Sequence, residues 1–149
     1  MITDFYSPLF EATKSVLNLM LDVSDIHECN IDTFKYNDIL SISIGIIGDY
    51  EGEIVYEFPQ NTSLNMVNIM SGMEIEKVDD FVTSAVSEIA NIISGNVITM
   101  LTAEDVKCDI LAPMLKGADN TNEYALKNDF CISTSVGKVC LDIRLNPVK

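Results

Sequence analysis

The chain has 149 residues, of which 48% are hydrophobic, and it carries a formal net charge of −14. This length suits one ordinary domain with a sizeable core, so we predict a single domain over residues 1–149. Only nine lysines and arginines are present, which strongly disfavours nucleic acid and anionic membranes as partners because binding to either relies on clustered basic side chains.

The longest apolar runs are short, as at residues 44–47, and the first residues have neither a basic region nor a cleavage site after a long apolar segment. We therefore expect no membrane span and no secretory signal, and we predict a cytoplasmic protein. The four cysteines form no CxxC or CxxH pair, and there is one histidine. This pattern predicts no zinc site and reduced, packed thiols at Cys29, Cys108, Cys131 and Cys140.

Hydrophobic periodicity predicts the elements of the first half of the chain. Apolar residues at helical spacing predict a helix over residues 8–21, with Ser7 and Pro8 as cap and first turn. From Asp38 the period changes to two, and a turn at residues 48–52 joins two alternating segments into a hairpin that ends at Pro59. Capping residues at 61–63 then predict a short helix over 64–70, with its C-cap at Gly72.

The longest helical pattern covers residues 78–101, which is roughly 35 Å of helix. Its predicted apolar stripe comprises Val78, Phe81, Val82, Ala85, Val86, Ile89, Ile93 and Val97. A strand is predicted over 106–111, then a loop over 113–123, then two alternating segments, 130–136 and 139–145, that turn at Gly137 and Lys138. Because βαβ repetition is absent, we predict an α+β fold with an antiparallel sheet packed against helices in a two-layer sandwich.

The polar side of the long helix carries the candidate functional residues. At 100° per residue, a set of four falls within about 60° on one side of the helix: Ser84, Glu88, Asn91 and Gly95. Glu88 can accept hydrogen bonds as a carboxylate, and Asn91 can donate and accept them through its amide. Both side chains can therefore contact the same bound molecule. Glycine at position 95 lowers the stability of the helix by about 1 kcal/mol relative to alanine. Its presence indicates that another backbone approaches closely there or that the helix bends. Asn96 points into the apolar stripe and is predicted to be a hydrogen-bonded structural amide.

Standard active-site motifs are missing from the sequence: there is no GxSxG, P-loop, GxGxxG or HExxH. Instead, SAVSEIANIISGNVIT (84–99) contains an E-x-x-N pair, and a glycine-punctuated hairpin, SISIGIIGDYEGEIVYEFP (41–59), precedes it. The segment MSG (70–72) lies between these two, and DILAPMLKG (109–117) lies after them. In these motifs the sequence resembles the CheC/CheX/FliY family of chemotaxis phosphatases from about residue 40 onward.

The resemblance is closer to one branch of that family. Members similar to CheC carry two E-x-x-N elements, whereas SLNMVNIMSG (63–72) has Asn65 and Asn68 but no glutamate. The resemblance therefore implies the CheX pattern, with one active face in each chain.

The resemblance also implies a function in chemotaxis or two-component signalling. The protein would be a hydrolase that removes the aspartyl phosphate of a CheY-like response-regulator receiver, and it would form a homodimer. Glu88 would pair with a receiver lysine and Asn91 would hold a water in line with the phosphate, while Ser84 and Gly95 would face the partner. The chain would bind no cofactor or metal of its own, since the Mg²⁺ would belong to the receiver.

Two other interpretations stay open. A domain of the same fold could bind a receiver as a non-catalytic adaptor, which predicts binding without phosphate release. Alternatively, a structural α+β homodimer could carry the E-x-x-N pair by coincidence, which predicts no interaction with any receiver.

Overall fold

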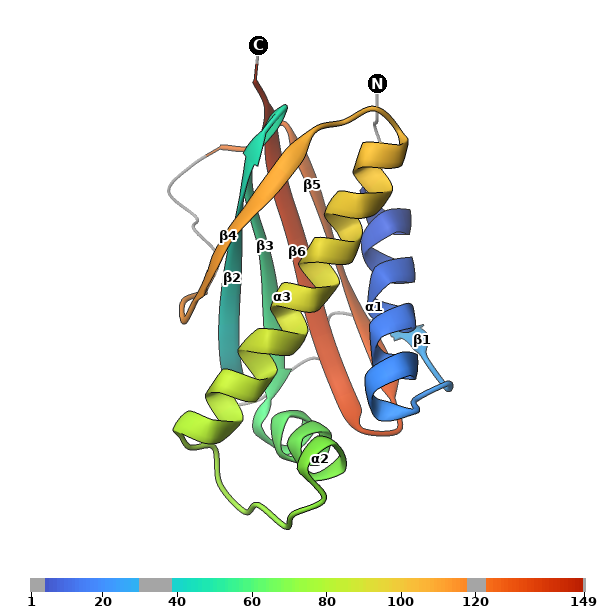
Figure 1. Cartoon of the computed structure of the whole chain (residues 1–149), viewed down its shortest axis with the longest axis vertical. Helices are drawn as coiled ribbons and strands as arrows, with labels where there is room; N and C mark the ends of the chain where they lie inside the picture. The colour runs from blue at the N-terminus through green and yellow to red at the C-terminus, as the bar shows by residue number, and fades with distance from the viewer. Residues whose placement is uncertain (1–4, 30–38, 118–122, 149) are drawn as a thin grey trace.

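The computed structural model describes residues 5–29, 39–117 and 123–148. An antiparallel sheet of six strands has the order β1-β5-β6-β3-β2-β4, and helices α1 and α3 lie across one of its faces with α2 near one end (Figure 1). The predicted two-layer α+β fold is confirmed. The elements in chain order are α1 (Tyr6–Leu21), β1 (His27–Cys29), β2 (Ile39–Gly48), β3 (Tyr50–Pro59), α2 (Gln60–Ser71), α3 (Asp80–Ala103), β4 (Cys108–Met114), β5 (Leu126–Thr134) and β6 (Gly137–Pro147).

The core lies between the helices and the sheet, because alternate residues of each strand point toward the helices. The buried side chains from the central strands include Ile42, Ile44, Ile46, Ile54, Tyr56, Leu141, Ile143 and Leu145. From α3 they include Val82, Val86, Ile89, Ile93 and Val97, as the apolar stripe predicted. Phe81 was wrongly placed in this stripe, since 49% of it is exposed. It lies about 80° around the helix from Ile89, at the edge of the buried side.

Helix α1 begins earlier than its apolar pattern predicted. Its N-cap is Phe5, which makes no capping hydrogen bond through its side chain. Ser7 and Pro8 therefore lie inside the first turn, so the predicted Ser7 cap is wrong. Proline is tolerated there because N–H groups of the first turn have no partner within the helix.

Helices α2 and α3 are capped in different ways. The predicted caps at residues 61–63 lie inside α2, which starts directly after Pro59; the hydroxyl of Thr62 instead donates to the carbonyl of Lys138, at 2.9 Å. The predicted C-cap is confirmed, because Gly72 adopts the left-handed conformation with φ of 70°. Helix α3 has a side-chain cap: the Asp79 carboxylate accepts from the backbone N–H of Val82 at 3.0 Å.

Several strand boundaries differ from the predicted ones. The first hairpin turns at Asp49 alone, and the last turns at Ser135 and Val136 instead of at residues 137–138. Strand β4 continues to Met114, so the predicted loop starts too early. Strand β1 was not predicted because three residues are too few to display an alternation. Asp38, the predicted start of the second strand, and residues 118–122 of the predicted loop lie outside the described residues.

Two cysteines form a disulfide, contrary to the prediction of reduced thiols. Cys131 in β5 and Cys140 in β6 are directly opposite in the hairpin register, and they are bonded to each other. Spacing along the chain could not reveal this pair, because it follows from the register of the hairpin. Cys29 and Cys108 are free.

Helix α3 is the one helix in the described part of the chain that is long and apolar enough to cross a membrane, judged by length and composition alone. Short apolar runs had indicated no such segment. In this fold the apolar side of α3 lies in the core, with Val86, Ile89 and Ile93 buried. The same composition is expected of a helix that packs against a sheet.

The close pairing of strands β3 and β6 at Gly52 leads to a prediction about stability. Gly52 pairs with Leu145 of β6, and a Cβ atom at Gly52 would collide with the carbonyl oxygen of Arg144. We expect Gly52→Ala to lower the free energy of unfolding by about 3 kcal/mol, because two paired strands would have to separate. Urea denaturation measures this loss, and a loss below about 0.5 kcal/mol would contradict the close strand pairing.

Candidate functional site

The four candidate residues lie on the side of α3 that faces away from the sheet. Ser84 and Glu88 are exposed, whereas Asn91 and Gly95 are half-buried. The helix is continuous through all four positions and crosses the helical side of the sheet (Figure 1). Glu88 and Asn91, three residues apart, are therefore close neighbours on a rigid element that a partner can approach.

A buried hydrogen bond holds the middle of α3 against the sheet. The hydroxyl groups of Tyr56 and Ser94 are 2.8 Å apart, and both residues are fully buried. Burial raises the pKa of Tyr56 above its ordinary value, although the hydrogen bond with Ser94 opposes this rise. The phenol therefore stays protonated. This support for the helix carrying Asn91 was not predicted, although an inward-facing tyrosine on β3 signals that its hydroxyl needs a buried partner.

Gly95 has no internal packing role that the structure displays. Among the described residues, a Cβ atom added there would meet no atom within 4 Å outside the neighbouring helix backbone. No described part of the chain therefore makes the close backbone approach that was one of the two predicted explanations, and an approach by the backbone of a partner molecule stays a prediction. The absence of a side chain leaves the helix surface open one turn beyond Asn91, at a cost in helix stability.

Other asparagines near α3 differ from Asn91 in position or in contacts. Asn96 is half-buried and lies about 140° around the helix from Asn91. On α2, the Asn65 amide donates to the carbonyl of Val136 at 2.9 Å, and the Asn68 side-chain oxygen accepts from the N–H of Ile75 at 2.8 Å. Asn65 and Asn68 thus anchor loops.

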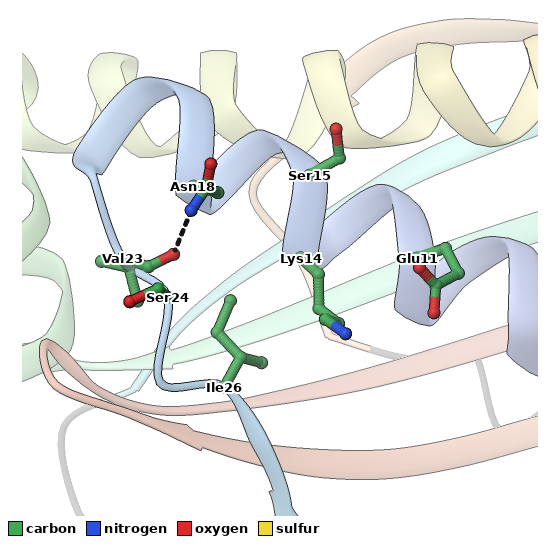
Figure 2. Close-up of a pocket in the computed structure, with 7 residues that line it drawn as sticks. All are labelled: Glu11, Lys14, Ser15, Asn18, Val23, Ser24 and Ile26. Atoms are coloured by element: carbon green, nitrogen blue, oxygen red, sulfur yellow. Dashed lines mark hydrogen bonds between the residues drawn. The ribbon is translucent and has the colours of Figure 1, made fainter.

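Glu88 and Asn91 lie apart from a pocket that the structure contains. A pocket of about 270 Å³ lies along α1 and the loop after it, with Glu11, Lys14 and Asn18 among its lining residues (Figure 2). None of the residues lining that pocket comes from α3. Small ligands bind mostly in concave sites, so side chains on the outer side of a helix favour a macromolecular partner.

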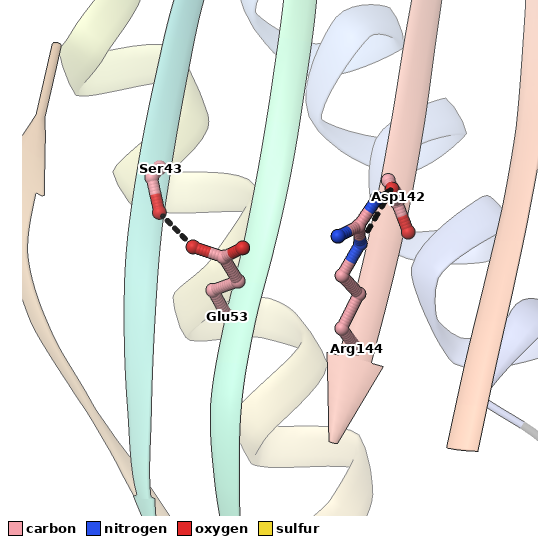
Figure 3. Close-up of polar contacts among 4 residues, drawn as sticks. All are labelled: Ser43, Glu53, Asp142 and Arg144. Carbon is pink, nitrogen blue, oxygen red and sulfur yellow. Dashed lines mark hydrogen bonds and ion pairs between the residues drawn. The ribbon is translucent and has the colours of Figure 1, made fainter. Parts of the chain in front are cut away.

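A separate polar network occupies the face of the sheet opposite α1 and α3. Ser43 donates to the Glu53 carboxylate at 2.9 Å, and Arg144 pairs with Asp142 at 2.8 Å (Figure 3). The hydrogen bond that Arg144 donates to the Asp142 carboxylate raises the pKa of Arg144 above its ordinary value. Because the sheet separates this network from α3, its charges belong to the structure of the sheet and not to the candidate site. Within residues 5–29, 39–117 and 123–148, no group of three or more His, Cys, Asp or Glu side chains is arranged to hold a metal.

Glu88 and Asn91 lie within a segment of the chain that matches a known protein family. Residues 40–135 match the family described as chemotaxis phosphatase CheX. A curated relative, the CheY-P phosphatase CheX of Thermotoga maritima, is 35% identical over 78 residues, which cover 51% of this chain and 50% of the relative. The match thus spans about half the length of that relative.

Solved structures share the fold over nearly the whole chain. Chemotaxis protein CheX from Vibrio vulnificus has a TM-score of 0.81 at 19% identity, covering 96% of this chain and 97% of its own. A CheX-CheY-BeF3-Mg²⁺ complex from Borrelia burgdorferi has a TM-score of 0.76 at 24% identity, covering 97% of this chain and 99% of the compared one. At these identities the likeness establishes the fold.

Proposed function

This chain belongs to the CheX family of chemotaxis phosphatases, and we propose from that premise that it dephosphorylates the aspartyl phosphate of a CheY-like receiver domain. The observation that carries the proposal is the position of Glu88 and Asn91, which lie one turn apart on the outward side of α3. Both lie inside the segment that matches the family. A curated relative that is 35% identical over 78 residues is itself a CheY-P phosphatase.

In the proposed mechanism the two side chains have different tasks. The exposed Glu88 carboxylate pairs with a lysine of the receiver and fixes the docked position. The Asn91 amide enters the receiver site and holds a water molecule in line with the phosphorus. The water attacks, the bond between the phosphorus and the aspartyl oxygen breaks, and inorganic phosphate leaves. Catalysis of this kind depends on orientation, so the enzyme needs no general base of its own.

The partner would supply the remaining parts of the reaction. We propose that the Mg²⁺ which neutralises charge on the phosphate belongs to the receiver, and that this chain binds no cofactor. The outward position of Asn91 supports this division, since a projecting side chain can be inserted into a cavity that the receiver provides. Ser84 and Gly95, one turn before Glu88 and one turn after Asn91, are small and would let the receiver approach the helix closely.

We further propose a cytoplasmic homodimer. Strand β4 forms one edge of the sheet and exposes half or more of two apolar side chains, Leu111 (50%) and Met114 (58%). An exposed apolar edge strand is a template for pairing with another copy. Sedimentation of the purified chain tests this proposal: a mass of two chains is expected, and a mass of one chain at all concentrations would contradict it.

Gly95→Ala should separate stability from function. Because no atom of the described chain outside the helix backbone lies within 4 Å of an added Cβ, alanine should raise the free energy of unfolding by about 0.5–1 kcal/mol. The same methyl group would lie where the receiver approaches, so kcat/KM for dephosphorylation should fall by roughly tenfold. Urea denaturation and phosphate release measure the two effects on one protein sample.

Thr102→Ala is the matched control for this substitution. Thr102 is exposed on α3 almost two turns beyond Gly95, where its hydroxyl donates to the carbonyl of Ile98. Alanine there should leave kcat/KM unchanged. A stabilised Gly95→Ala protein with full activity would mean that the receiver does not approach the helix at this position.

A further inference from the structure

Three cysteines occupy one row across three neighbouring strands. The strand register places Cys29 of β1 opposite Cys131 of β5, and Cys131 opposite Cys140 of β6. Directly opposite residues of antiparallel strands have their side chains on the same face. Since strands lie about 4.8 Å apart, the three sulfur atoms follow one line across the sheet.

The neighbouring residues identify the face on which this row lies. Glu28 accepts a hydrogen bond from the hydroxyl of Tyr6 in α1 at 2.6 Å, and Ile132, its partner in the register, is buried in the core. Both therefore point to the helical side. Cys29 and Cys131 are the adjacent residues on the same two strands, so they point to the face opposite α1 and α3.

The three sulfur atoms differ in their access to solvent. Cys131 is fully buried and Cys140 is 5% exposed, so the disulfide between them is shielded. Cys29 is a free, half-buried cysteine on the edge strand β1. A small thiol from solution consequently meets Cys29 before it meets the disulfide.

We propose that this row is a thiol–disulfide exchange site for low-molecular-weight thiols such as glutathione, in which Cys29 opens the buried disulfide. The Cys29 thiolate forms a bond to Sγ of Cys131 while the Cys131–Cys140 bond breaks. Cys140 leaves as a thiolate on the far side of Cys131, which is the in-line geometry that the row provides. It takes up the proton that Cys29 released, so this step involves no net oxidation.

Reduction then proceeds at the accessible edge of the sheet. One glutathione attacks Cys29, forming a mixed disulfide and releasing the Cys131 thiol. A second glutathione attacks the mixed disulfide, which yields oxidised glutathione and the Cys29 thiol. The balance is two glutathione thiols consumed, one glutathione disulfide formed and two protein thiols regained. In a reducing compartment, disulfides that persist are mostly transient or redox-sensing, and this route would let cellular thiols control the bond.

Cys108 is the matched control because it lies outside the row. It is half-buried on β4, at the opposite edge of the sheet, and its thiol donates to the carbonyl of Tyr50 at 3.9 Å. Burial raises the pKa of the Cys108 thiol, which lowers its nucleophilic fraction at neutral pH. A Cys108 variant therefore removes one free thiol without touching the proposed site.

The experiment follows reduction of the full chain under native conditions. The protein is oxidised with glutathione disulfide and then exposed to reduced glutathione, and the loss of the Cys131–Cys140 bond is followed by alkylation and peptide mass spectrometry. Wild type and Cys108→Ser should lose the bond at the same rate, whereas Cys29→Ser should lose it at least roughly tenfold more slowly. Partially exchanged wild type should contain a peptide pair joined through Cys29 and Cys131.

Two outcomes would overturn the proposal. One is an equal reduction rate in Cys29→Ser and in wild type. The other is the absence of both the Cys131–Cys140 bond after oxidation and the Cys29–Cys131 pair during exchange. If Cys29→Ser does not fold, blocking the accessible Cys29 thiol of folded wild type with a single alkyl group gives the same comparison, because the disulfide has already formed.

Discussion

Asn91→Ala is expected to reduce the rate of receiver dephosphorylation by about 100-fold or more. The affinity of this variant for the receiver should stay within about threefold of the wild-type affinity. The proposed role of Asn91 is to orient the attacking water, and the loss of a positioning group has effects of this size on the chemical step. Rapid mixing with a phosphorylated receiver separates the rate of phosphate loss from binding. A substantial loss of affinity at unchanged maximal rate would mean that Asn91 is a docking residue.

Asn96→Ala provides the matched control for Asn91. Both residues are half-buried asparagines on α3, but they point in directions about 140° apart. Alanine at position 96 should leave the catalytic rate of the folded protein nearly intact. If both substitutions abolish activity equally, disturbance of the helix would explain the loss better than water positioning.

Glu88→Gln is expected to weaken receiver binding by about tenfold or more, because it removes the charge that pairs with the receiver lysine. The amide preserves the size of the side chain, so the helix itself should be unaffected. The affinity for a beryllofluoride-activated receiver, measured by titration calorimetry, should fall, and the difference from wild type should shrink as the salt concentration rises.

Glu104→Gln makes the same change in net charge at the far end of α3, where the residue is exposed. It should bind the receiver like wild type. An equal loss of affinity in both variants would attribute the effect to overall charge, which at −14 is large enough to influence the encounter with any charged partner.

The elements that the sequence predicted well are those whose pattern repeats over several turns or residue pairs. Helix α3 and strands β2 and β3 each place a long, regular series of apolar side chains in the core, and this series identified them in the sequence. The N-caps of α1 and α2 were misplaced because a helix start depends on a few local contacts. The Thr62 hydroxyl, for instance, bonds to the distant Lys138 carbonyl instead of capping its own helix.

The placement of the candidate residues on one side of α3 could be predicted from helical geometry alone. The angles between Ser84, Glu88 and Asn91 follow from the helix, and the outward side of α3 follows from its apolar stripe. Two features required the folded chain. The Tyr56–Ser94 hydrogen bond joins residues 38 apart in sequence, and the cysteine row depends on the register of three strands.

The most direct test of the proposed phosphatase activity is the decay of a phosphorylated CheY-like receiver from the same genome, with Mg²⁺ present, with and without this protein. We expect wild type to accelerate phosphate release and the Asn91→Ala variant to leave the decay at its intrinsic rate. Binding of wild type without acceleration would contradict phosphatase activity and identify the chain as an adaptor. The absence of binding to any receiver would favour a structural role.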